Sequence, residues 1–139
     1  MWWIYALLAA FFAALTAIFA KVGIKGVESD LATAIRAVII LILSWGIAIF
    51  SGSASTIHTL SKGNIIFLCL SGVATGLSWI FYFKALQSGQ VSQVAALDKM
   101  SVAIVIILSI IFLGESLTIK TAVGALLIIS GSLVLVSSN

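Results

Sequence analysis

The chain has 139 residues, of which 63% are hydrophobic and only 8% are charged, and its formal net charge is +3 at pH 7. Soluble domains carry roughly a quarter charged residues, so this composition excludes an ordinary soluble protein and indicates a membrane protein. Because one membrane-spanning helix takes ~20 apolar residues, no room is left for a separate soluble domain. The seven basic residues are too sparse for a nucleic-acid-binding stripe, so no nucleic-acid partner is expected.

Five apolar stretches follow one another along the chain, and each is long enough to cross the bilayer. The expected spans are residues 2–20, 31–50, 64–83, 91–113 and 119–136. The connections are short and contain turn and capping residues, among which Asp30 and Thr118 are the predicted N-caps of the second and fifth helices. The expected fold class is therefore all-α, a polytopic membrane bundle of five transmembrane helices that forms a single domain over residues 1–139.

An odd number of spans places the two termini on opposite sides of the membrane. We call the side that holds the amino terminus side A, and the other side B. Side A then carries Lys62 and Lys120, and side B carries Lys21, Lys25 and Lys84. The positive-inside rule favours a cytoplasmic side B, but three basic residues against two is nearly a balance, which permits insertion in both orientations.

The fourth span contains an acid and a base, Asp98 and Lys99. Asp98 lies about seven residues past the start of the span, ~10 Å below side B at 1.5 Å per residue. A carboxylate cannot reach the surface from that depth, whereas the long stem of Lys99 can. Because neighbours on a helix point roughly 100° apart, the two are predicted not to neutralise each other. Arg36, six residues into the second span, is the predicted partner of Asp98.

Two interpretations of these charges stay open. In one, a buried salt bridge between Arg36 and Asp98 only fixes the packing of the helices. In the other, the charges form a site that binds a polar or charged solute, or a proton on Asp98. Ionisable residues inside a membrane commonly mark transport pathways, so the functional interpretation is favoured.

The third span carries a polar stripe, because Ser71, Thr75, Ser78 and Tyr82 recur at helical spacing on one face, with Trp79 beside them. The stripe is typical of hydrogen bonding between helices. It equally fits the wall of a cavity that leads to the charges near side B, and both interpretations stay open.

The same span contains a small-residue pair, Gly72 and Gly76, at the GxxxG spacing. Such pairs let helix backbones approach closely in a membrane. We interpret these glycines as a structural motif for packing.

No signature of enzyme chemistry is present. The single histidine and single cysteine cannot build a zinc or iron site, and the sequence has no phosphate-binding glycine loop, nucleophile elbow or HExxH motif. We therefore expect no enzymatic activity, no metal and no cofactor.

The segments "GLSWIFYFKALQSGQVSQVAALDKMS" and "FLGESLTIKTAVGALLIISGSLVLV" resemble the EamA-like repeat of the drug/metabolite transporter superfamily. More narrowly, they resemble its single-repeat, five-helix bacterial and archaeal transporter branch. The resemblance covers almost the whole chain, and it implies a multi-pass protein of the inner cell membrane of a bacterium or archaeon. Its motifs are "LGE", which closes the fourth helix and contains Glu115, and "DK" followed by Ser101.

By this resemblance, Trp79 and Tyr82 match the aromatic end of the family's third helix, and Asp98, Lys99, Ser101 and Glu115 match its motif positions. Glu115 is expected to be structural, bonding amides in the first turn of the fifth helix. The predicted solute- or ion-binding side chains are Asp98, Lys99, Arg36, Trp79, Tyr82, Ser78, Thr75 and Ser101.

Larger members of the family fuse two such repeats in opposite orientation around a central substrate pathway, but only one repeat is found here. A lone repeat needs a second copy, inserted upside down, to complete such a site. The resemblance thus implies a secondary transporter that moves a small metabolite or drug-like solute, as an antiparallel homodimer of dual topology with alternating access. The alternatives are a heterodimer with a separately encoded partner, a non-transporting membrane scaffold or chaperone subunit, and a flippase for a lipid-linked sugar.

Overall fold

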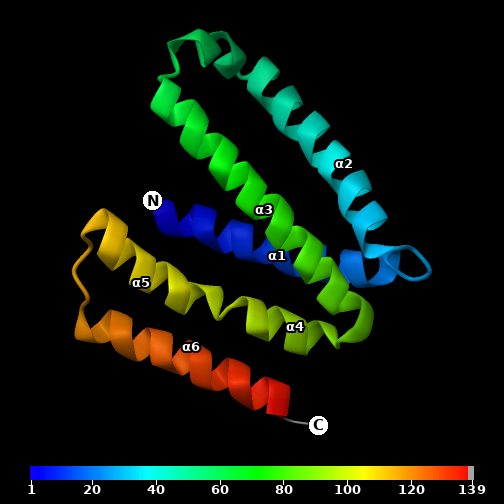
Figure 1. Ribbon diagram of the computed structural model, residues 1–139, viewed down its shortest axis with the longest axis vertical. Helices are drawn as coiled ribbons and strands as arrows, with labels where there is room; N and C mark the ends of the chain where they lie inside the picture. The colour runs from blue at the N-terminus through cyan, green and yellow to red at the C-terminus, as the bar shows by residue number, and fades with distance from the viewer. Residues whose placement is uncertain (138–139) are drawn as a thin grey trace. The chain divides into compact units, whose positions relative to one another are not determined.

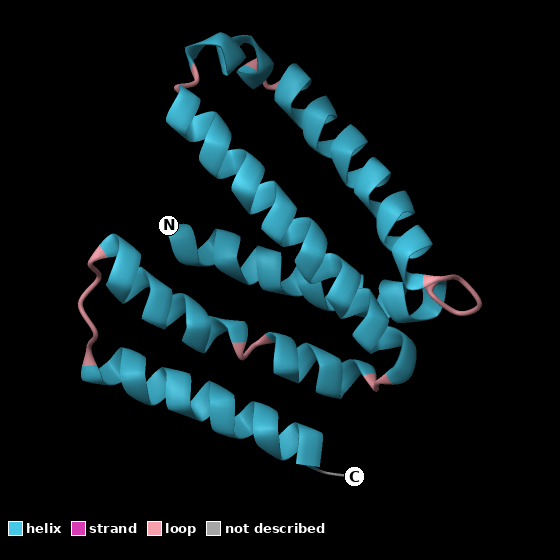
Figure 2. Cartoon of the chain, viewed as in Figure 1, coloured by secondary structure: helices cyan, strands magenta, loops and turns pink. Residues whose placement is uncertain are grey.

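The structure, a computed structural model, describes residues 1–137 and is built from helices (Figures 1 and 2). Five stretches within these residues are long and apolar enough to cross a membrane, which confirms the all-α class and the five spans. The elements are α1 (Trp2–Gly23), α2 (Ser29–Phe50), the 3₁₀ helix η1 (Ser53–Thr59), α3 (Lys62–Ser88), α4 (Val91–Asp98), α5 (Ser101–Leu113) and α6 (Ile119–Ser137).

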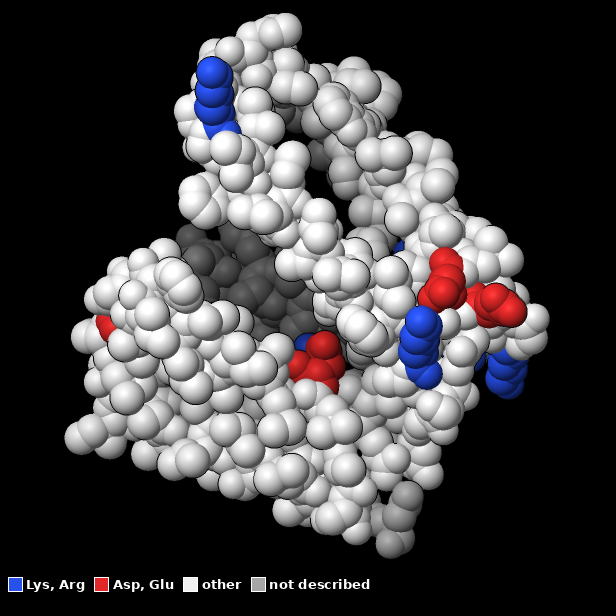
Figure 3. Space-filling model, viewed as in Figure 1, with Lys and Arg blue, Asp and Glu red and all other residues white. Residues whose placement is uncertain are grey.

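The described residues form two compact units. The terminal unit combines Met1–Phe19 with the described residues from Ser88 onward, and the central unit is Ala20–Gln87. The expectation of one domain over residues 1–139 stays a prediction. Surface charge is scarce, as the composition requires, and Figure 3 shows small groups of charged side chains on an otherwise uncharged face.

In the central unit, α2 and α3 run in opposite directions and are joined through η1 (Figure 1). The unit is tied together at its other end, where the loop after α1 meets the last turn of α3. There the Gln87 Nε2 donates a hydrogen bond of 2.9 Å to the Val27 carbonyl, and the Lys21 Nζ donates one to the Leu86 carbonyl. Leu86 is completely buried and Phe83 nearly so, so this end holds the apolar core of the unit.

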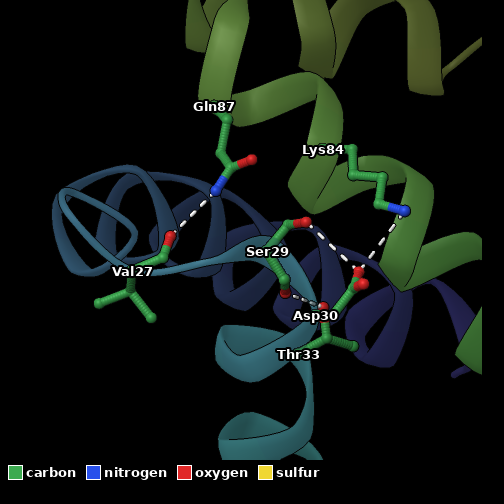
Figure 4. A network of polar contacts seen from close by, with 6 residues as sticks. All are labelled: Val27, Ser29, Asp30, Thr33, Lys84 and Gln87. Carbon is green, nitrogen blue, oxygen red and sulfur yellow. Dashed lines mark hydrogen bonds and ion pairs between the residues drawn. The ribbon is translucent and has the colours of Figure 1, made fainter.

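The start of α2 differs from the expectation, and the prediction that Asp30 is its N-cap is wrong. The helix begins at Ser29, after Glu28, which makes no side-chain capping bond. Asp30 lies in the first turn instead, where the helix dipole favours a carboxylate, and it pairs with Lys84 at 3.6 Å. Figure 4 shows this contact together with the hydrogen bond of 2.8 Å from the Thr33 hydroxyl to the Ser29 carbonyl. Asp30 therefore joins α2 to α3.

In the terminal unit, α6 packs against both α4 and α5. The turn between α5 and α6 explains the "LGE" motif in physical terms. Gly114 has a φ of 67°, a left-handed conformation that strains other residues, and the Glu115 amide then donates to the Ser109 carbonyl and closes α5. The predicted N-cap of the last helix is confirmed, because the Thr118 hydroxyl oxygen accepts a 3.1 Å hydrogen bond from the Thr121 amide.

Candidate functional site

The fourth span is interrupted at the residues that the sequence singled out. We expected one continuous helix over residues 91–113, but α4 ends at Asp98 and α5 begins at Ser101 (Figure 2). Around the break, four amides each donate a hydrogen bond to the carbonyl three residues earlier, namely those of Lys99, Met100, Val102 and Ala103. This tighter pattern leaves some carbonyls without the amide that an α-helix would supply. Polar backbone is therefore presented beside the charged pair.

The side chains at this break pair with each other, so the prediction that they would not is wrong. The Lys99 Nζ lies 3.3 Å from the Asp98 Oδ2, and the two side chains are 60% and 41% exposed, respectively. The helical offset of roughly 100° orients only the Cα–Cβ bonds, whereas the end of a long lysine stem can swing back towards its neighbour. The carboxylate is thus neutralised locally but stays accessible.

Arg36 is held by aromatic rings on α3. Its guanidinium carbon lies 4.6 Å from the centroid of the Trp79 ring and 5.4 Å from that of Phe83. A cation over such a face is stabilised by ~0.5–2 kcal/mol, more where water is excluded. Asp30, the acid of α2, contacts Lys84 instead. Arg36 therefore keeps an uncompensated positive charge within the described central unit.

The sequence analysis named Trp79 as a candidate site residue without predicting its contact with Arg36, and it did not place Phe83 in the site. The spacing could have indicated it, because Trp79 and Phe83 are four residues apart and so lie on the same face of α3. In the structure Phe83 is 3% exposed. Arg36 and Asp98 belong to different units, and the pairing expected between them stays a prediction.

The polar stripe of α3 is partly satisfied by its own helix. The Thr75 hydroxyl donates a 2.9 Å hydrogen bond to the Ser71 carbonyl of the preceding turn. Ser78 is exposed and Tyr82 is half-buried. The choice between helix packing and a cavity wall stays open for this stripe.

Gly72 and Gly76 make no close helix contact within the described central unit. A methyl group added at either residue would meet no other atom within 4 Å. Their predicted role in helix packing stays a prediction.

The two remaining motif residues lie at the ends of α5. Ser101 is exposed and opens that helix directly after the break, and Glu115 is exposed in the loop beyond it. The amide in the first turn of α6 is capped by Thr118, so the predicted capping role of Glu115 has no hydrogen bond to support it in the described residues.

Comparison with known proteins agrees with this architecture. The sequence pattern of the EamA-like transporter family matches residues 1–137. A protein of a Sinorhizobium species, described as an uncharacterized transporter in the cobO 3′ region, is 45% identical over 134 residues, which cover 96% of this chain and 95% of that protein. No solved structure matches the chain.

Proposed function

Because the chain belongs to the EamA-like transporter family, which matches residues 1–137, we propose that it is a secondary transporter for a small metabolite or drug-like solute. The relative that is 45% identical is itself described as a transporter. Five apolar helices make the chain a multi-pass membrane protein. In this proposal it resides in the inner membrane of a bacterium or archaeon and catalyses no chemical reaction.

The observation that carries the proposal is the break between α4 and α5. Asp98 is the last residue of α4, so it lies ~10 Å from the start of that helix at 1.5 Å per residue. Irregular backbone at membrane depth is tolerated only where it is covered by protein or lines a water-filled cavity. Discontinuous helices of transporters place freed carbonyls and charges at the bound solute or ion. A break of this kind, with a charged pair on it, supports a binding role.

In the proposed mechanism Asp98 contacts the solute or accepts a coupling proton. Either event weakens its 3.3 Å contact with Lys99, and the long stem of Lys99 can then carry the ammonium towards the headgroups. Arg36, positioned on the Trp79 ring, supplies a counter-charge for Asp98 or for an anionic group of the solute. Binding and release of the solute are thereby coupled to a change in the paired charges.

The proposed assembly is an antiparallel homodimer that alternates access to a shared cavity. One five-helix repeat supplies half of an inverted pair, so a second copy in the opposite orientation completes the site. The open surfaces at Gly72 and Gly76 offer the close helix approach that such a contact uses.

The experiment begins with a thermal-shift screen of the purified wild-type protein against organic acids, amines and zwitterions. A compound that raises the melting temperature is a ligand of the folded state. A panel without any such compound favours the scaffold or chaperone interpretation.

The compound found in this way is then used for counterflow transport in reconstituted vesicles. Asp98→Asn should insert normally and lower transport by about tenfold or more, because a hydrogen bond to a charged group contributes ~1.5–3 kcal/mol. The matched control is Glu115→Gln, which neutralises an exposed carboxylate in the loop after α5 and leaves the lysines that set the orientation in place. Full transport by Asp98→Asn would reduce Asp98 to a packing residue.

A further inference from the structure

A pocket of about 410 Å³ lies at the tied end of the central unit. It is formed by the loop between α1 and α2 and by the end of α3. Its lining residues are Lys21, Ile24, Lys25, Gly26, Val27, Glu28 and Gln87. None of these residues belongs to the proposed solute site.

The walls of this pocket are held in place by hydrogen bonds. Gly26 turns the loop with a φ of 75°, and the Val27 amide donates to the Ile24 carbonyl at 3.2 Å. The Val27 carbonyl in turn accepts the 2.9 Å hydrogen bond from Gln87 that Figure 4 shows. Lys21 is anchored to the Leu86 carbonyl. These hydrogen bonds fix the conformation of the loop that forms the pocket.

The ionisable lining residues are two lysines and one glutamate, Lys21, Lys25 and Glu28, so the pocket carries a formal charge of +1. The neighbouring pair of Lys84 and Asp30 neutralises itself at 3.6 Å. The side chains of Lys25 and Glu28 are exposed, so both can reach a ligand. A ligand that matches these groups carries an anion for the lysines and a cation for the carboxylate.

The pocket lies at the level where three spans end. Lys21 is in the last turn of α1, Glu28 directly precedes α2, and Gln87 is in the last turn of α3. The ends of transmembrane helices lie among the lipid headgroups, where the local anion is phosphate.

We propose that this pocket binds a phosphoethanolamine group, presented by a phosphatidylethanolamine lipid at the membrane surface. The phosphate contacts the two lysines, of which Lys25 is the exposed one. The ammonium contacts the Glu28 carboxylate. A phosphocholine group cannot donate a hydrogen bond to that carboxylate, and a phosphoglycerol group has no cation for it. The pocket therefore distinguishes headgroups as well as attracting phosphate.

The test is native mass spectrometry of the purified protein in detergent with an equimolar mixture of phosphatidylethanolamine, phosphatidylglycerol and phosphatidylcholine. The wild type should retain phosphatidylethanolamine above the other two lipids. Lys25→Gln should lower that retention by about fivefold, because one lysine near the headgroup phosphate is lost. Glu28→Gln should keep phosphate binding but lose the preference over phosphatidylglycerol.

Two controls accompany these variants. Lys25→Arg keeps the charge and should restore retention, and Lys62→Gln removes an exposed lysine from the first turn of α3 and should leave retention unchanged. Equal retention of the three lipids by the wild type, or an equal loss in Lys62→Gln, would overturn the proposal.

A further arm separates a lipid from a soluble ligand of the same chemistry. Free phosphoethanolamine is added at the same concentration as the lipid. It should not displace phosphatidylethanolamine, because it has no acyl chains to contact the apolar surface of the spans. Complete displacement would assign the pocket to a soluble phosphate compound and contradict the lipid proposal. Lipid retention is measured without transport, so its outcome is independent of the proposed solute transport.

Discussion

Within the central unit, Arg36 is stabilised by aromatic rings rather than by a carboxylate. Its guanidinium lies over Trp79 and beside Phe83, while Asp30, two turns away on the same helix, contacts Lys84. Guanidinium is planar and weakly hydrated, so it suits such stacking better than an ammonium group does. The positive charge of Arg36 can therefore still pair with an anionic group inside the span.

A double-mutant cycle tests this contact. Arg36→Gln and Trp79→Leu should each destabilise the protein, and their coupling should be ~0.5–2 kcal/mol because both remove the same cation–π contact. The free energy of unfolding is measured by titration with a denaturing detergent. The matched cycle of Arg36→Gln with Trp45→Leu uses an exposed tryptophan of α2 and should show no coupling. Equal coupling in both cycles would refute a specific contact with Trp79.

At the scale of the element, the fourth span shows how a helix stops without a helix breaker. Residues 91–113 contain neither glycine nor proline, and their apolar length still meets the requirement for a span. The backbone nevertheless changes to bonds between residues three apart around Lys99 and Met100. The change coincides with the charged pair of Asp98 and Lys99, and no helix-breaking residue type marks it.

Hydrogen exchange measured by mass spectrometry should locate the break. The amides of residues 99–103 should exchange about tenfold faster than those of residues 38–42 in the continuous α2, as expected when a hydrogen bond of ~0.5–1.5 kcal/mol is weakened. The variant Asp98→Leu with Lys99→Leu tests whether the charged pair maintains the break, and it should slow exchange there. Uniform protection along residues 91–113 of the wild type would show a continuous helix instead.

At the scale of the whole molecule, the proposed dimer requires both orientations in one membrane. Lys62 and Lys120 on side A nearly balance Lys21, Lys25 and Lys84 on side B. The positive-inside rule acts on such small differences, so a change of two lysines should select one orientation.

Cysteine labelling at the two termini from each side of the membrane tests this prediction. The background is Cys69→Ser, which removes the single native cysteine so that label reports only on the introduced ones. Each terminus should be labelled from both sides, and the double variant Lys62→Gln with Lys120→Gln should be labelled in one orientation and lose transport. If the protein with all its native lysines were labelled in a single orientation, the antiparallel homodimer would be contradicted and a fixed-topology assembly would remain.

Much of the architecture followed from local properties of the chain. Apolar length predicted the five spans, because the cost of burying polar backbone in lipid acts on each segment separately. The capping of α6 by Thr118 was predictable for the same reason, since a cap joins residues three apart. Asp98, Lys99, Arg36 and Trp79 were recognisable as candidates from their residue types alone.

The contacts of those candidates depended on the tertiary structure. The cation–π contact of Arg36 with Trp79 and Phe83, and the ion pair of Asp30 with Lys84, join α2 to α3 across some 40 or more residues of chain. The break beside Asp98 and Lys99 coincides with the charged pair but is not marked by a glycine or a proline. Membrane insertion is decided one segment at a time, whereas the partner of a charge is decided by which helices meet, and that depends on packing over the whole unit.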